Sequence, residues 1–344
     1  MINNSSRRRA LKLATLLTAG ALVITGCSSE DSTTTETTES SSNDAGGEDT
    51  AAEGDTRTVT DYEGNEVELP SDPQRVVTLH FAATEALVDL GMAPVGQGGY
   101  TEGLLPPEKA KDIENVPQVS EREGIELEAI AALEPDLILV PNYVETDDLE
   151  QLRAIAPSYI YMHGGEDRAD WRGRVGQVAD AVNQADKIDE LETTLEDRQA
   201  ELQEKHDDVL ADRRFAVINS YNEQEVDLNS DASMLGNILG PIGVQWSDQI
   251  NETVGDEDGG EFTVSLEEIN NAVGDADVLF YGTNLALEPT ETFEILQAEP
   301  LYKNLKAVED GNVYPIGKMT VAGYTDAMFS LDLLDEALTD LTNK

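Results

Sequence analysis

The chain has 344 residues, and its 70 acidic residues outweigh 22 basic ones to give a formal net charge of −48. So acidic a surface repels phosphate backbones and anionic lipid headgroups, which argues against a nucleic-acid-binding protein. The single cysteine, Cys27, excludes an intrachain disulfide and a thiolate metal cluster, and the three histidines are scattered along the sequence. We therefore expect neither a resident metal ion nor another cofactor.

Residues 1–26 have the pattern of an export signal, with a basic start, an apolar run at 13–24 and small residues after it. The run is too short to span a bilayer comfortably. The letters ITGC at 24–27 resemble the lipobox of bacterial lipoproteins, in which cleavage precedes the cysteine and lipid is attached to it. The letters SRRRALK at 6–12 resemble a twin-arginine signal with alanine in place of phenylalanine, so the twin-arginine and general secretory routes both stay open.

Residues 27–56 begin with the expected lipidated Cys27 and continue as a polar, acidic stretch without aromatic residues. Such a stretch cannot bury enough apolar surface to offset its conformational entropy, so we expect it to be disordered. It would then act as a tether that holds a folded protein near the membrane and lets it turn.

Residues 57–166 have the pattern of an N-terminal α/β lobe. Alternating residues on either side of a turn at 63–65 indicate a hairpin. Apolar runs then alternate with helical runs, which predicts a parallel sheet flanked by helices, with strands at 75–79, 136–140 and 158–162 and helices at 84–90, 127–133 and 147–156. Ligands of such sheets bind beyond the carboxyl ends of the strands, a rule that selects His80, Phe81, Tyr100, Tyr143 and His163.

Between residues 167 and 212, apolar residues recur at steps of three and four, the period of an amphipathic helix. A single rod would be about 65 Å long at about 1.5 Å per residue, so we expect a break near Asn183 and Gln184 and a longer helix over 185–209. Residues 167–209 would be a spine between two lobes or a coiled-coil dimer arm. The spine is favoured because the apolar stripe does not hold a strict heptad.

Residues 210–344 repeat the α/β pattern as a C-terminal lobe. Strands are predicted at 214–218, 278–281 and 313–316, and helices at 233–239, from 264 onward behind a serine cap, and at 325–341. The acidic stretch at 255–261 lacks the spacing of an EF-hand, so we expect a solvated loop there. The strand-end rule selects Tyr221, Trp246, Tyr281, Asn284, Lys318 and Tyr324.

The predicted fold class is therefore α/β: two lobes, each with a mainly parallel sheet flanked by helices, joined by one long α-helix. The sequence contains no G-x-S-x-G, H-E-x-x-H or C-x-x-C motif. Since the spacing also shows no convergent acid–base group, we expect a protein that is not an enzyme.

Four segments and the predicted spine together resemble the class III substrate-binding proteins of ABC importers, which bind iron siderophores, haem or cobalamin. The segments are RVVTLHFAATEALVDLGMAPVGQGGY, VPQVSEREGIELEAIAALEPDLILV, SLEEINNAVGDADVLFYG and PLYKNLKAVEDGNVYPI. The similarity runs from about residue 57 to the C-terminus. It implies two α/β lobes on a rigid helix, a ligand in the cleft between them, and an ABC permease as partner, at the extracytoplasmic face of the cell membrane.

The resemblance also implies a docking mode. Members of the family engage arginines of the permease through one glutamate on each lobe, and the matching positions are Glu128 and Glu267. Such a contact needs an exposed carboxylate because bidentate pairing with arginine is directional. Without the resemblance, either residue could equally be one of many surface glutamates.

For the ligand we expect a ferric siderophore, which requires aromatic walls and cationic donors. The cationic candidates are Arg122, Arg168, Arg172 and Lys318, whereas Trp171 is expected to pack in the spine. Cobalamin or haem is the alternative cargo within the family, and a surface lipoprotein without a transport role is the alternative outside it. We expect a lipid-anchored monomer.

Overall fold

A computed structural model describes residues 55–121 and 124–344, which belong to one compact unit, Ala52–Lys344. The leader, Cys27, the tether up to residue 54 and Arg122 lie outside the described residues. Among the described helices, none combines the length and the apolar character needed to cross a membrane.

The N-terminal lobe, residues 55–181, is built on a parallel sheet in the order β3–β7–β8. Every residue of β7 is buried, as expected for a parallel strand that is covered on both faces. A bridge between Val77 and Gly96 joins this sheet to β4–β5–β6, and the predicted hairpin is present as β1 and β2. The strands are β1 Thr56–Thr60, β2 Glu66–Pro70, β3 Val76–Thr78, β4 Gln97–Gly98, β5 Gln118–Glu121, β6 Gly124–Ile125, β7 Leu137–Pro141 and β8 Ser158–Tyr161.

The first helix of this lobe begins earlier than predicted because His80 caps it. Its backbone is extended, and its ring Nδ1 accepts a hydrogen bond from the N–H of Ala82 at 3.1 Å. The last helix, α5, was predicted as part of the spine, but it packs on α1 and β8 and so belongs to the N-terminal lobe. The helices are α1 Phe81–Asp89, α2 Pro107–Ala110, α3 Leu127–Ala132, α4 Thr146–Ile155, the 3₁₀ turn η1 Glu166–Ala169 and α5 Trp171–Ala181.

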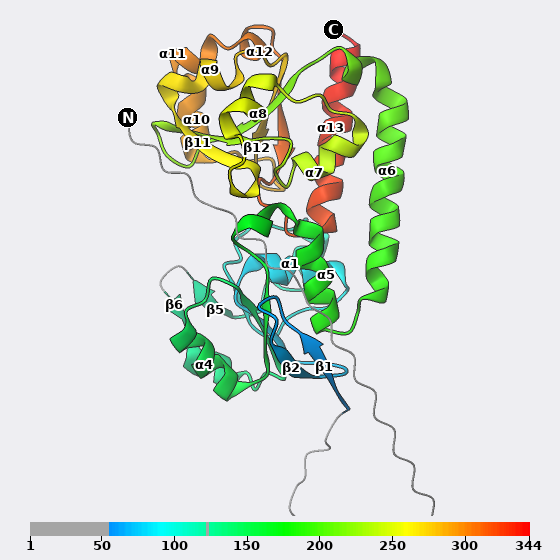
Figure 1. The fold of residues 1–344 in the computed structure, drawn as a ribbon, viewed down its shortest axis with the longest axis vertical. Helices are drawn as coiled ribbons and strands as arrows, with labels where there is room; N and C mark the ends of the chain where they lie inside the picture. Colours follow the sequence, from blue (N-terminus) through cyan, green and yellow to red (C-terminus); the bar gives the residue numbers. More distant parts are fainter. Residues whose placement is uncertain (1–54, 122–123) are drawn as a thin grey trace, which may run out of the picture. The chain divides into compact units, whose positions relative to one another are not determined.

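The predicted break between two helices is confirmed. α5 ends at Ala181, Asn183 takes a left-handed conformation with φ 56°, and α6 then runs for 26 residues over Asp186–Ala211. Figure 1 shows α6 alongside α13 Tyr324–Thr342, against which it packs. The inner face of α6 is buried, so its apolar stripe is covered within the chain, as expected for a spine rather than a dimer arm; the buried residues are Leu195, Gln199, Leu202, His206 and Leu210.

A charged contact joins these two long helices. The carboxylate of Asp335 on α13 accepts hydrogen bonds from Arg198, Lys205 and His206 of α6 at 3.1, 2.5 and 2.7 Å. Burial alone would raise the pKa of Asp335, but these donors lower it to about 2. The carboxylate is therefore charged at neutral pH and fixes the register between the helices.

The C-terminal lobe, residues 212–344, holds a five-stranded sheet in the order β11–β10–β9–β12–β13. Strands β9, β12 and β13 are parallel, as predicted. Strands β10 and β11 run antiparallel and were not predicted; the acidic stretch at 255–261 is not a loop throughout, because Glu261 begins β11. The strands are β9 Phe215–Asn219, β10 Glu225–Asn229, β11 Glu261–Ser265, β12 Val278–Gly282 and β13 Val313–Gly317.

Short helices and 3₁₀ turns surround this sheet. The predicted serine cap is present, because Ser265 and Glu268 form a capping box at the start of η4. Besides α13, the helical segments are α7 Gly236–Leu239, η2 Gly240–Ile242, α8 Asp248–Val254, η3 Asp258–Gly260, η4 Leu266–Glu268, α9 Ile269–Val273, α10 Glu291–Ala298, α11 Pro300–Lys303 and α12 Lys306–Glu309.

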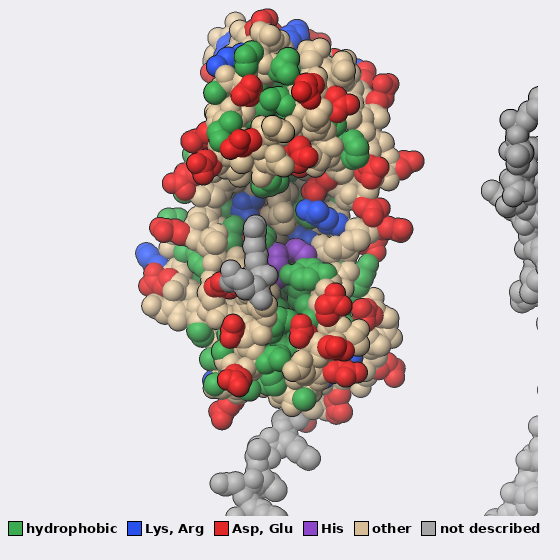
Figure 2. All heavy atoms as spheres, turned by 90° about the vertical axis from the view of Figure 1, so that its left-hand side faces the viewer, with side chains coloured by type: hydrophobic (Ala, Val, Ile, Leu, Met, Phe, Trp, Pro, Cys, Tyr) green, Lys and Arg blue, Asp and Glu red, His purple; other side chains and the backbone are tan. Residues whose placement is uncertain are grey.

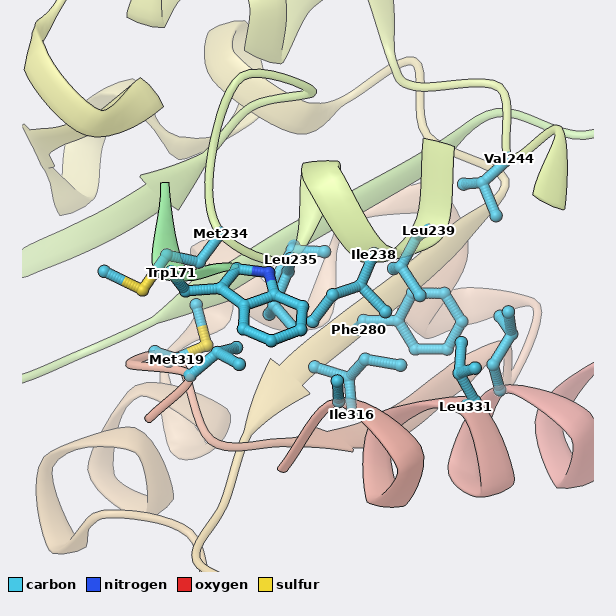
Figure 3. Packing of buried hydrophobic residues seen from close by; sticks show 14 of the residues in the cluster. Trp171, Met234, Leu235, Ile238, Leu239, Val244, Phe280, Ile316, Met319 and Leu331 are labelled. Atoms are coloured by element: carbon cyan, nitrogen blue, oxygen red, sulfur yellow. The ribbon is translucent and has the colours of Figure 1, made fainter. Parts of the chain in front are cut away.

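One residue of the N-terminal lobe enters the core of the other lobe. Trp171, the first residue of α5, is fully buried and lies edge-on to the ring of Tyr324 at 5.2 Å. Figure 3 shows it among Met234, Leu235 and Met319 of the same core cluster. Trp171 therefore packs rather than lining a chamber, as expected, but it does so in the core of the C-terminal lobe and not in the predicted spine, and its packing ties the two lobes together.

Candidate functional site

Three adjoining cavities lie along the boundary between the lobes, where Figure 2 shows the surface to be hollowed. The first, here called the N-terminal chamber, has a volume of about 820 Å³. The central chamber, of about 320 Å³, shares Phe81 with it. The acidic chamber, of about 520 Å³, shares Tyr221, Met319 and Thr320 with the central one. Because neighbouring chambers share wall residues, they adjoin one another along the cleft between the lobes.

Aromatic rings gather where the N-terminal strands end. The ring centroids of His80 and His163 are 4.0 Å apart, and Phe81 lies 4.2 Å from His80. Tyr143 lies 5.6 Å from His163, and more than half of its side chain is exposed. His80, Phe81, Tyr143 and the predicted Tyr100 all line the N-terminal chamber. Residues from three strand ends therefore meet, as the strand-end rule predicts.

The two histidines of this wall are neutral. Burial, followed by the charges of Arg174 and Lys318, lowers the pKa of His80 to about 4. Burial, followed by His80 and Arg174, lowers the pKa of His163 to about 2. Within the described ranges no group of three or more His, Cys, Asp or Glu side chains could hold a metal ion. The wall is therefore a neutral aromatic surface.

The central chamber presents buried polar groups from the ends of β9 and β12. Asn219 and Thr283 are 2% and 7% exposed, and the Oδ1 of the first and the Oγ1 of the second have no hydrogen-bond partner in the described part of the chain. Gly282 lets Asn219 and Met319 approach the end of β12, because a Cβ there would lie 3.0 Å from the Nδ2 of Asn219 and 2.6 Å from Met319. Buried polar atoms are normally paired, so both are available to a ligand.

The floor of the central chamber is a buried ionic cluster that crosses the lobes. Lys318, which lines the chamber, places its Nζ 2.6 Å from Glu85 of α1 and 2.8 Å from Asp326 of α13. Burial, and then the neighbouring Asp326, raise the pKa of Glu85 well above its usual value. Burial would lower the pKa of Lys318, but Asp326 and Glu85 raise it overall, so the ammonium stays charged.

Arg174 adds a second buried cation behind the same floor. Its side chain is fully buried and donates to the carbonyl of Val321. Its Nε and Nη1 have no hydrogen-bond partner among residues 55–121 and 124–344. Neither Arg174 nor Glu85 was predicted, because a charged residue on an amphipathic helix gives no sequence signal that it is buried.

Three of the predicted ligand contacts lie elsewhere, and these predictions are corrected. Trp246 is buried in the C-terminal lobe, where its backbone bridges to Phe215. Tyr324 is 3% exposed and donates to Glu192 at 2.8 Å. Tyr281 stacks on Phe293 at 4.9 Å. The strand-end rule finds the right edge of the sheet, but it does not say which way each side chain points.

The remaining predicted residues divide between the cleft and other surfaces. Tyr221, Asn284 and Lys318 line the central chamber, and Arg168 lines the acidic chamber. Arg172 instead pairs with Glu192 on α6 at 3.0 Å.

Both predicted docking glutamates are exposed. Glu128 lies in the first turn of α3 and Glu267 in the first turn of η4. They stand on different lobes, as a two-point contact requires.

Comparison with known proteins gives one matching family and a consistent set of relatives. The family described as "Periplasmic binding protein" matches residues 76–320. A probable siderophore-binding lipoprotein of Bacillus subtilis is 31% identical over 286 residues, which cover 80% of this chain and 86% of that protein. A Fe(3+)-citrate-binding protein of Bacillus subtilis is 26% identical over 294 residues, or 84% of this chain and 87% of that protein.

A solved structure is also similar. The siderophore periplasmic binding protein from the fuscachelin gene cluster of Thermobifida fusca superposes with a TM-score of 0.67 at 29% identity. The superposition covers 79% of this chain and 98% of that one.

Replacing Lys318 by Met should lower the free energy of unfolding by about 3–5 kcal/mol, because two buried carboxylates would lose their cation. The matched control is Lys306→Met. The Lys306 side chain is 53% exposed in its pair with Asp277, so its loss should cost less than about 1 kcal/mol. Urea unfolding measures both.

Equal losses in the free energy of unfolding for the two variants would contradict the conclusion that Lys318 is buried between two carboxylates. If the Lys318→Met protein does not fold, adding Glu85→Gln should recover part of the stability, because only one unpaired carboxylate then remains.

Proposed function

The chain belongs to the periplasmic binding protein family, and from that premise we propose that it captures a ferric siderophore between its lobes and delivers it to an ABC importer. The family consists of substrate-binding proteins rather than enzymes. The observation that carries the proposal is the row of adjoining chambers, with an aromatic wall on one lobe and, on the other, buried polar atoms that have no partner among the described residues.

The chemistry of the cleft suits a bulky chelate. Apolar and aromatic walls with a few fixed polar groups are typical of small-molecule sites, and each chamber falls in or near the usual range of about 300–1,000 Å³. The rings of Phe81 and Tyr143 can contact the organic shell of a chelate, while Asn219 and Thr283 can pair with its polar atoms. The relatives named for siderophores and for Fe(3+)-citrate support the same ligand class.

The anchor and the location are part of the proposal. Cys27 would carry the lipid, and residues 28–56 would tether the lobes to the extracytoplasmic face of the membrane. The Bacillus subtilis relative that is named a lipoprotein supports this arrangement. Export would follow either the twin-arginine or the general secretory route, and the lobes would act as a monomer.

Isothermal titration calorimetry with ferric hydroxamate, catecholate and carboxylate complexes should give saturable binding for one of these classes, with a Kd between about 1 nM and 1 µM. Tyr143→Ala should weaken that binding about tenfold, because a ligand-facing aromatic anchor contributes more than about 1 kcal/mol. The control is Leu301→Ala, since Leu301 is a similarly exposed apolar residue on α11. Binding of cobalamin or haem, with no ferric siderophore bound, would contradict the proposal.

Glu128 and Glu267 are proposed to dock on the importer, one on each lobe. Cells that depend on this protein for siderophore uptake should lose most uptake when both residues are changed to Ala. Purified Glu128→Ala/Glu267→Ala protein should bind the siderophore as before, because neither residue lines a chamber.

The matched control for docking is Glu108→Ala/Glu291→Ala, since these are also exposed glutamates in the first turns of helices on the two lobes. A similar loss of uptake in the control, or normal uptake in the docking variant, would overturn the assignment.

A further inference from the structure

The acidic chamber is lined by the antiparallel pair of strands β10 and β11. Asp227 stands opposite Thr263, and Asn229 stands opposite Glu261. Side chains directly opposite in an antiparallel pair share a face, as do residues two apart along one strand. The register therefore places all four on one face, and all four line the chamber of about 520 Å³.

This face accepts hydrogen bonds but offers few donors. Asn229 is 3% exposed, and its Oδ1 has no hydrogen-bond partner among the described residues. Asp227 accepts from Thr263 at 2.7 Å, and Asp258 adds a further carboxylate to the wall. A buried acceptor without a donor costs about 1–3 kcal/mol, so the chamber is poised for a group that donates hydrogen bonds.

A guanidinium already occupies one side of the chamber. Arg168 reaches across from η1 of the N-terminal lobe, and its Nη2 lies 3.0 Å from Glu261. Its side chain packs over Gly259 and stays 42% exposed. The contact shows that Glu261 can pair with a planar cation, yet one cation does not balance the three carboxylates of Asp227, Asp258 and Glu261.

We propose that the acidic chamber binds the cationic arm, a protonated amine or guanidinium, of the iron chelate. The proposal rests on the proposed function, since the metal-binding part of the same ligand would lie in the central and N-terminal chambers. An arm can reach the chamber because Tyr221, Met319 and Thr320 border it and the central chamber alike. The Oδ1 of Asn229 and the carboxylate of Asp227 accept its protons, and charge-assisted bonds are the stronger kind.

The test compares two ferric complexes that differ only in the charge of one arm. One is ferric desferrioxamine B, a linear trihydroxamate that ends in a primary amine; the other is its N-acetylated form, which is neutral at that end. A second pair uses a tris-catecholate with a free or an acetylated amine. In calorimetric titrations the amine form of the pair that binds should bind about tenfold more tightly, which corresponds to about 1.4 kcal/mol.

Two variants test whether the preference for the amine form arises in the acidic chamber. Asp227→Asn and Asn229→Leu should each reduce the preference for the amine to less than about threefold while leaving the affinity for the acetylated complex unchanged, which also shows that the variants fold. The control Asp310→Asn changes a 54% exposed carboxylate away from the cleft and should keep the full preference.

Three other outcomes would each overturn a stated part of the proposal. Equal binding of the two members of a pair overturns the cationic subsite and leaves the proposed function standing. A preference that survives in both chamber variants overturns the assignment to this chamber. Failure of every member of both pairs to bind overturns the cationic subsite, and the siderophore function is overturned with it only if the ferric carboxylate complex also fails to bind.

Discussion

The buried contact of Lys318 with Glu85 and Asp326 is the constraint on which the cleft depends. Removing ionisable groups from water is costly, and they are tolerated only when each stays within hydrogen-bond distance of its partner. Glu85 belongs to α1 and the other two to the C-terminal lobe. Because the contact is satisfied at one separation of the lobes, it sets the width of the cleft. The packing of Trp171 in the core of the C-terminal lobe also limits movement of the lobes, as does the packing of α6 against α13.

A cleft of fixed width has consequences for recognition. Its walls are formed before the ligand arrives, so less of the binding free energy is spent on ordering side chains and loops. The neutral rings of one lobe, the buried polar atoms of the central chamber and the carboxylates of the acidic chamber would then contact different parts of the proposed ligand. Lys318 lines the central chamber, and its charge is balanced there by Glu85 and Asp326.

Much of the fold could be predicted from the sequence, and the reasons are physical. Strand ends that are far apart in sequence brought His80, Tyr143 and His163 together, because parallel strands share an edge. The break at Asn183 could be predicted because a single helix over residues 167–212 would be too long for one compact domain. In contrast, the burial of Glu85 and Arg174 depends on the other lobe, and the acidic chamber depends on the pairing register of two short strands, neither of which leaves a local pattern.

The distance between the lobes tests this account most directly. Spin labels at Arg153→Cys on α4 and Glu294→Cys on α10, in a Cys27→Ser background, report it by electron double resonance, since both positions are exposed. A cleft of fixed width should give one narrow distance distribution that a bound ferric siderophore shifts by less than about 2 Å. A broad or bimodal distribution in the free protein, or a larger shift on binding, would contradict it.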